Sequence, residues 1–306
     1  MTAAFSTPIT TLADQDGVIE GPWRKPINLL RAQTYDDHAS IHDDATAQKL
    51  GFRGGTIEGP THFSQITPLL VHLWGTEWFE NGAISANYRN ASYEGEEVKA
   101  QVKPTSSSSA QISVLKLDGT VVLTGSGAIG SHAEPGVALA KLQRAHPLIE
   151  PRILKGASIG MRVPSRVVRM DYAQRMGDLY PFSLQEKLAN ITEPSPFYER
   201  SAATPWNRPV MPVEMISVLC QHLASDDGFP VSFPVVGLFA DQEISLRSGP
   251  VSPELDYRLE REIIALTETP KTESMWLRSR LFRDDSLIAE MTLNQAFLKA
   301  SSPLYA

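Results

Sequence analysis

The sequence predicts an α+β protein made of two similar halves, each with one buried helix packed on an antiparallel sheet. The 306 residues are too many for one average core and suit two domains of about 150 residues. In the first half, one segment with helical apolar spacing precedes four strand-like segments. The same order of elements recurs in the second half, which indicates an internal repeat of the fold.

The main helix of the first half is expected to begin at Gly59-Pro60, because a proline at the first helical position loses no hydrogen bond. Apolar residues then recur at helical spacing from Phe63 to Trp74. A short helix is expected at 45–50, where Asp44 is favoured over Asp43 as its cap. The predicted strands are residues 83–92, 98–102, 108–117 and 120–130. Residues 26–33 could be a first strand or a short helix, and a strand is expected.

The second half is expected to repeat this pattern with a strand at 163–170 and an apolar helix at 213–223. Four further strands are predicted at 235–246, 255–267, 274–283 and 287–298. The region between the halves lacks strand patterning and is punctuated by prolines. We therefore expect a first domain over 1–134, a linker over 135–160 and a second domain over 161–306.

Composition excludes several classes of function. A net charge of −7 provides no basic stripe, so a nucleic-acid partner is not expected. A single cysteine, Cys220, can form neither an internal disulfide nor a zinc cluster, which indicates a reducing compartment. The N-terminal residues do not resemble a signal peptide, and no apolar run approaches the roughly 18 residues of a membrane span. A cytoplasmic protein without a membrane partner is expected.

Titratable residues are concentrated just before the predicted main helix, between Thr34 and Ile66. Aspartates, histidines and a glutamate occur there together with four glycines. Side chains that precede a buried helix are held by a rigid element, as a functional site requires. This stretch is therefore the candidate site, and the rest of the chain is its scaffold.

This stretch resembles the hydratase motif of MaoC-type hot-dog proteins. That motif runs aspartate, any residue, asparagine, proline, an aliphatic residue, histidine, any residue and aspartate, and later an aliphatic-x-His-Gly turn opens the central helix. The matching segments here are Asp37-His38-Ala39-Ser40-Ile41-His42-Asp43-Asp44, Gly51-Phe52 and Ile57-Glu58-Gly59. The segment from Tyr88 to Val98 is similar to the strand and turn that follow the helix in the family.

The resemblance implies a double hot-dog fold, in which a curved antiparallel sheet surrounds each central helix and the two sheets pair edge to edge. It also implies a hydro-lyase that adds water to the double bond of an enoyl thioester or removes it. By position, Asp37 and His42 would be the catalytic pair. Gly59 would supply the oxyanion donor, and Glu58 and Gly59 would contact the substrate.

The chemistry fits these residue types. Histidine exchanges protons near neutral pH, so His42 can act on water that Asp37 also orients. Free N–H groups at Gly59 and Thr61 would stabilise the enolate. No cofactor or metal is expected beyond an acyl thioester substrate carried by CoA or a carrier protein. The second half lacks an Asp-x4-His pattern, so one site per chain is expected, in either a monomer or a homodimer.

The sequence departs from the family pattern at three positions. Ala39 and Ser40 replace the usual asparagine and proline, and Glu58 replaces the usual histidine. A carboxylate at 58 would oppose an enolate unless it is protonated or turned away, which suggests a modified substrate or reaction. Glu58 could equally be an ion-pair partner of Arg53.

Two other functions remain open on the same fold. One is acyl-CoA thioester hydrolysis, which would release a free thiol. The other is a non-catalytic acyl-binding module that has kept the scaffold. His62 is expected to be a packed core residue, and Arg89 and Lys99 could meet a CoA phosphate or simply be solvated.

Overall fold

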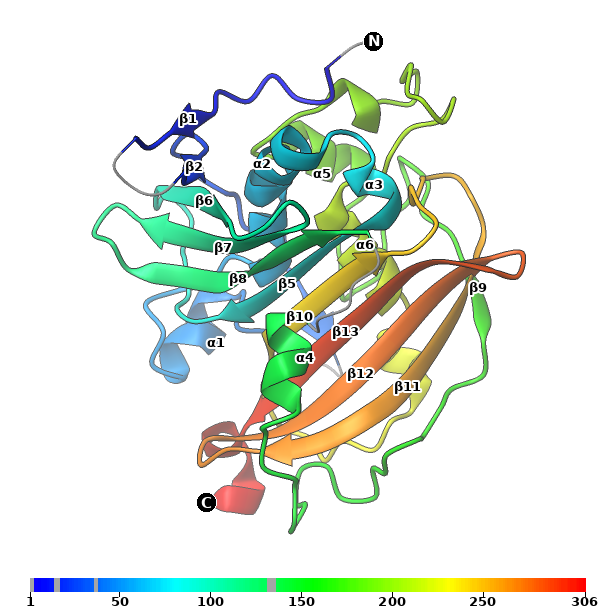
Figure 1. Ribbon diagram of the computed structural model, residues 1–306. Helices are drawn as coiled ribbons and strands as arrows, with labels where there is room; N and C mark the ends of the chain where they lie inside the picture. Colours follow the sequence, from blue (N-terminus) through cyan, green and yellow to red (C-terminus); the bar gives the residue numbers. More distant parts are fainter. Residues whose placement is uncertain (1–2, 14–16, 36–37, 131–135) are drawn as a thin grey trace.

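The protein is described by a computed structural model that covers residues 3–13, 17–35, 38–130 and 136–306. Its main feature is an eleven-stranded antiparallel sheet that runs through both halves of the chain (Figure 1). In the order of the sheet, the strands are β1 (Thr10–Thr11), β2 (Ile19–Glu20), β6 (Val98–Pro104), β7 (Ser109–Lys116), β8 (Val121–Ile129), β5 (Gly82–Tyr88), β10 (Gly237–Leu246), β13 (Ser286–Leu298), β12 (Thr272–Arg283), β11 (Tyr257–Glu268) and β9 (Arg166–Val168).

The two halves join where β5 pairs with β10. The antiparallel register runs from Ala83 opposite Ser245 to Asn87 opposite Asp241. A hydrogen bond of 2.8 Å from the Tyr88 hydroxyl to Oε1 of Gln242 adds a side-chain link at the end of this ladder. The expected edge-to-edge pairing of the two sheets is therefore present.

Two buried helices lie on one face of the sheet, one from each half (Figure 1). The first begins with a 3₁₀ turn, Gly59–His62, and continues as α2 (Phe63–Trp74) until Gly75, whose φ of 67° suits glycine. The second is α6 (Val213–Gln221), in which every residue is buried. The helices contact each other, and one hydrophobic cluster contains residues of both halves. The two predicted domains thus share a core.

The opposite face is covered at the junction by α4 (Val137–Leu142), which lies in the predicted linker (Figure 1). Lys141 of α4 forms an ion pair of 2.8 Å with Asp241, a fully buried residue of β10. Asn87 and Asn294 donate to the same carboxylate at 2.6 and 2.7 Å. These contacts satisfy a buried charge and fix α4 over the seam between the sheets.

The smaller elements revise several details of the prediction. The remaining helices and the separate two-stranded pair are α1 (Asp44–Lys49), α3 (Trp78–Asn81), α5 (Leu184–Asn190), β3 (Thr34–Tyr35) and β4 (His38–Ala39), and 3₁₀ turns lie at Pro196–Tyr198, Ala224–Asp227, Lys299–Ser301 and Pro303–Tyr305. Residues 26–33 form no strand. The cap of α1 is Asp43, which accepts from the Thr46 N–H, whereas Asp44 accepts from the Gly55 N–H at 2.7 Å.

Within the described part of the chain, no helix has both the length and the apolar character needed to cross a bilayer.

Candidate active site

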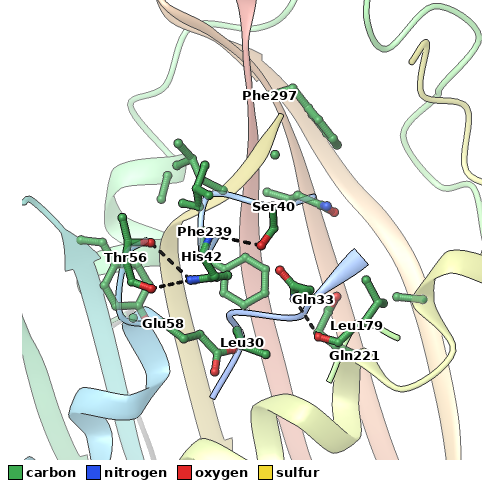
Figure 2. A pocket seen from close by; sticks show the side chains of 18 of the residues that line it. Leu30, Gln33, Ser40, His42, Thr56, Glu58, Leu179, Gln221, Phe239 and Phe297 are labelled. Carbon is green, nitrogen blue, oxygen red and sulfur yellow. Dashed lines mark hydrogen bonds between the residues drawn. The ribbon is translucent and has the colours of Figure 1, made fainter. Parts of the chain in front are cut away.

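A cavity of about 600 Å³ lies between the two halves, and His42, Glu58 and Gly59 of the predicted site line it (Figure 2). First-half residues line one side of it, from the His42 loop, the start of the α2 helical segment and the end of β5. Second-half residues line the other side, from the loop that follows α6 and from β10, β12 and β13. A ligand in this cavity would contact both halves at once.

His42 is a half-buried residue of the cavity wall, and its ring is held by the backbone. Nδ1 lies 2.7 Å from the carbonyl oxygen of Thr56 and 3.3 Å from the Thr56 hydroxyl (Figure 2). A carbonyl oxygen can only accept, so Nδ1 must carry the proton. Nε2 is then unprotonated in the neutral ring, and it has no hydrogen-bond partner among the described residues. This tautomer presents a lone pair that can accept a proton.

The environment keeps this histidine neutral. Burial lowers the pKa of His42 from 6.5 to about 4, and the hydrogen bond to Thr56 opposes that shift only in part. The cause is the loss of water around a ring that would become charged. At neutral pH, His42 is therefore a base rather than an acid.

The loop that carries His42 is fixed by close backbone approach at Gly55. A Cβ at position 55 would lie 2.2 Å from the His42 carbonyl oxygen, so only glycine fits there. Asn28 donates to the same carbonyl at 2.9 Å, and the Thr56 N–H donates to Ile41 at 3.0 Å. The Gly54-Gly55 turn in the sequence thus serves to place Thr56 beside the imidazole.

Gly59 lies at the start of the helical segment, as predicted, and its lack of a side chain leaves room for the ring of Tyr88. A Cβ there would lie 2.4 Å from the ring of Tyr88, which also lines the cavity. The predicted second donor, Thr61, is already used, because its N–H donates to the Glu58 carbonyl at 3.1 Å. Of the two, the Gly59 N–H is the one without a hydrogen-bond acceptor among the described residues, so it can donate to an oxyanion.

Glu58 lines the cavity and is only 7% exposed. Its expected alternative partner, Arg53, pairs instead with Glu96 at 2.7 Å, so the ion-pair interpretation of Glu58 was wrong. Burial raises the pKa of Glu58 to about 7, although Lys187 and a hydrogen bond from Tyr180 oppose the shift. The carboxyl group is thus partly protonated at neutral pH.

The part of the cavity beyond α6 is mostly apolar. Aromatic, aliphatic and methionine side chains of the second half line it, namely Phe229, Val231, Phe233, Phe239, Met275, Leu277 and Phe297. Such a surface suits an apolar chain rather than a sugar or a nucleotide. The long strands β12 and β13 extend past the end of α6 (Figure 1). Met275 and Leu277 of β12 and Phe297 of β13 form part of this wall.

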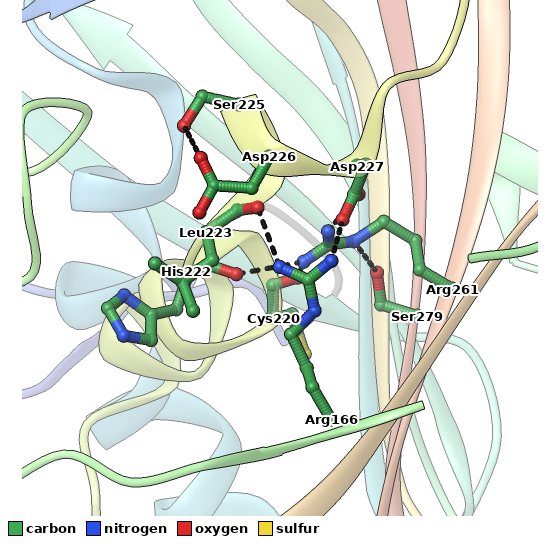
Figure 3. A network of polar contacts seen from close by, with 9 residues as sticks. All are labelled: Arg166, Cys220, His222, Leu223, Ser225, Asp226, Asp227, Arg261 and Ser279. Carbon is green, nitrogen blue, oxygen red and sulfur yellow. Dashed lines mark hydrogen bonds and ion pairs between the residues drawn. The ribbon is translucent and has the colours of Figure 1, made fainter. Parts of the chain in front are cut away.

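Two arginines bind the C-terminal end of α6 and the loop that follows it (Figure 3). The buried Arg261 donates to the Cys220 carbonyl at 2.5 Å and pairs with Asp227. Arg166 donates to the Leu223 carbonyl at 3.1 Å and to Asp227 at 2.9 Å. Charged donors at a helix C-terminus satisfy its free carbonyl groups. They hold the loop after α6 at the cavity, which Ala224, Ser225, Asp227 and Gly228 line.

The remaining residues singled out from the sequence are Asp37, His62, Lys99 and Arg89. Asp37 lies outside the described residues, so its predicted role stays a prediction. His62 is a packed core residue, as expected, with Nε2 2.9 Å from the Ser92 hydroxyl oxygen. Lys99 is engaged by Glu20 at 2.7 Å, whereas the exposed Arg89 lies at the cavity.

Sequence reasoning missed Gln221, a buried residue at the end of α6 that lines the cavity. Its Nε2 has no hydrogen-bond partner among the described residues. A polar residue at the end of a mostly apolar helix was the available signal. The described residues include no group of three or more histidine, cysteine, aspartate or glutamate side chains arranged to hold a metal ion.

No family model and no curated protein sequence matches the chain. Among solved structures, it is similar to RV0216, a conserved hypothetical protein from Mycobacterium tuberculosis that has a double hot-dog fold. The two are 11% identical over 97% of each chain, with a TM-score of 0.54. A MaoC-like dehydratase is also similar, with 12% identity over 97% of this chain and 98% of that one and a TM-score of 0.49. The likeness to RV0216 shows that the chain has a double hot-dog fold.

Proposed function

We propose that this protein is a hydro-lyase that reversibly hydrates or dehydrates an enoyl or 3-hydroxyacyl thioester. The observation that carries the proposal is the His42 tautomer, with Nδ1 bonded to the Thr56 carbonyl and Nε2 without a hydrogen-bond partner among the described residues. The MaoC-like motif supports it, since it places a catalytic histidine at this position. Removing the α-proton of a 3-hydroxyacyl thioester requires such a neutral base.

The other parts of the site have matching roles. The Gly59 N–H can donate to the thioester oxygen as negative charge develops on it. Asp37 is proposed as the partner of His42 from the motif alone. Glu58 and Gly59 are proposed to contact the substrate, because both line the cavity beside the start of the α2 helical segment.

The cavity also indicates how the substrate would lie. Its apolar end, beyond α6, suits the acyl chain, and its volume of about 600 Å³ is within the usual range for small-molecule sites. Arg89 is exposed at the cavity, and no described residue forms an ion pair with it. A guanidinium there could pair with a phosphate of CoA or of a carrier arm.

The proposal is tested by incubating the purified protein with enoyl-CoA and 3-hydroxyacyl-CoA substrates of several chain lengths. Hydration is followed by loss of the conjugated thioester absorbance, and free thiol is measured in parallel. We expect interconversion of the two substrates without thiol release. Thiol release would assign the protein as a thioesterase instead. Binding without any conversion would assign it as an acyl-binding module.

A further inference from the structure

We propose that Glu58, in its protonated form, is the catalytic acid that delivers a proton to the leaving hydroxyl group of the substrate. This inference rests on the proposed dehydration. The reaction needs one group that takes a proton and another that gives one. His42 can only take one, because its proton is on Nδ1 and is held by the Thr56 carbonyl. A second group at the cavity must therefore give one.

Glu58 is placed to be that group. Its side chain lines the same cavity as His42, and Figure 2 shows both among the side chains of the cavity wall. It is 7% exposed, and no described residue forms an ion pair with it. The nearby cation, Lys187, is held by Glu214 at 2.5 Å and by the Thr61 hydroxyl at 3.1 Å. A buried carboxyl without a paired cation is most stable when neutral.

Burial favours the protonated form of Glu58, and the groups around the carboxyl group act on its pKa in both directions. Glu214 of α6 adds negative charge that raises the pKa, whereas Lys187 of α5, which is paired with Glu214, adds positive charge that lowers it. A hydrogen bond from Tyr180 also lowers the pKa, and burial outweighs both of the lowering effects. The Tyr88 hydroxyl donates to Gln242 instead, so it does not supply a proton to Glu58.

The step balances with these two residues. Nε2 of His42 takes the α-proton, and the electron pair of that C–H bond becomes the new carbon–carbon double bond. The bond between the β-carbon and the hydroxyl oxygen breaks as that oxygen receives the proton of Glu58. The products are an enoyl thioester and water. His42 is left protonated and Glu58 is left as a carboxylate, and proton exchange with solvent resets both.

The acid role of Glu58 also explains why a glutamate replaces the motif's histidine at this position. A permanently charged carboxylate beside the Gly59 N–H would oppose the developing enolate. A neutral carboxyl does not oppose it during the step in which the enolate forms. The carboxylate appears only as the hydroxyl leaves, when the negative charge departs from the substrate with the hydroxyl oxygen and is neutralised there by the proton of Glu58.

The test compares two substrates in the wild type and in Glu58→Gln. A 3-hydroxyacyl thioester needs a proton on its leaving group, whereas a 3-chloroacyl thioester loses chloride without one. We expect Glu58→Gln to lower kcat for dehydration by about 100-fold or more and to leave elimination of chloride within a few-fold of wild type. His42→Gln should lower both rates, because both substrates lose the same α-proton.

Three results would overturn the acid role of Glu58. Equal loss of both reactions in Glu58→Gln, with thermal unfolding unchanged, would overturn the acid role. So would wild-type dehydration by Glu58→Gln together with loss in Asp37→Asn, which would assign the acid to Asp37. An absence of dehydration by the wild type itself would overturn the proposed function and this inference with it. A second prediction is that Tyr180→Phe shifts the alkaline limb of kcat/KM to higher pH, since it removes a hydrogen bond that lowers the pKa of Glu58.

Discussion

Nδ1 of His42 and the carbonyl oxygen of Thr56 are 2.7 Å apart, although the residues are fourteen positions apart in the chain. The contact fixes which ring nitrogen is protonated and which can react. It exists because the turn at Gly54-Gly55 brings the chain back against the His42 loop. The reactive state of the site is therefore determined by backbone geometry as much as by the identity of the histidine.

Gly55→Ala should displace the His42 loop. Its Cβ would lie 2.2 Å from the His42 carbonyl oxygen, so the backbone must shift. A displacement of this kind can cost about 100-fold in kcat. Steady-state kinetics measure the loss. Gly21→Ala is the matched control, because a Cβ there meets nothing within 4 Å. Equal activity of the two variants would show that the loop position does not matter.

Gly237→Leu should shorten the acyl chain that the site accepts. Gly237 lines the apolar end of the cavity, where a Cβ would lie 3.4 Å from the Phe297 ring without a clash. The rest of a leucine side chain would fill space that a long chain needs, at a cost of about 1–3 kcal/mol. We expect KM for long-chain substrates to rise about 10-fold or more, with KM for short ones unchanged. Gly237→Ala is the control, and a uniform change across chain lengths would contradict this orientation of the substrate.

Glu58→Gln should change how stability depends on pH. The pKa of Glu58 is raised from 4.5 to about 7 in the folded protein. The stability from its protonated form is therefore complete below pH 4.5 and is lost as the pH rises through 7. The loss of folding stability is on the order of 3 kcal/mol. A glutamine at position 58 does not ionise, so the variant does not lose this stability.

Urea unfolding of both proteins between pH 4.5 and 8 measures this difference. The variant should gain stability relative to wild type as the pH rises. His42 behaves oppositely, because its lowered pKa removes stability as the pH falls from 6.5 towards 4, but both proteins share that loss. A stability difference that does not vary with pH would show that Glu58 is not held neutral.

Arg89→Ala should weaken binding of a CoA thioester more than binding of a thioester without phosphates. Arg89 is exposed, so its contribution is about 0.2–1 kcal/mol, or a KM increase of up to about 5-fold for the CoA substrate. Added salt should reduce the difference between wild type and variant. KM values for matched CoA and N-acetylcysteamine thioesters provide the comparison. Equal effects on both substrates would place the phosphates elsewhere.

The repeated order of helix and strands could be predicted from the sequence, because apolar spacing and turn residues act locally. The motif also led to His42, Glu58 and Gly59, which the structure brings to one cavity. Residues 26–33 were wrongly expected to be a strand. Their mixed composition has no clear strand or helix period and is compatible with the turns that the structure shows there.

Features that depend on distant contacts could not be predicted. Gln221 lines the cavity only because the two halves pair through β5 and β10, and its own segment reads as a core helix. The raised pKa of Glu58 comes from burial in a cavity that distant segments of the chain close. Neither relationship leaves a local pattern in the sequence.

The central claim is that His42 is the base of a hydro-lyase. The most direct measurement compares wild type, His42→Gln and His42→Ala for conversion of a 3-hydroxyacyl-CoA to the enoyl-CoA, with circular dichroism as the check on folding. We predict that both variants fold normally and lose about 100- to 10,000-fold in kcat. Turnover at the wild-type rate in both folded variants would contradict the account.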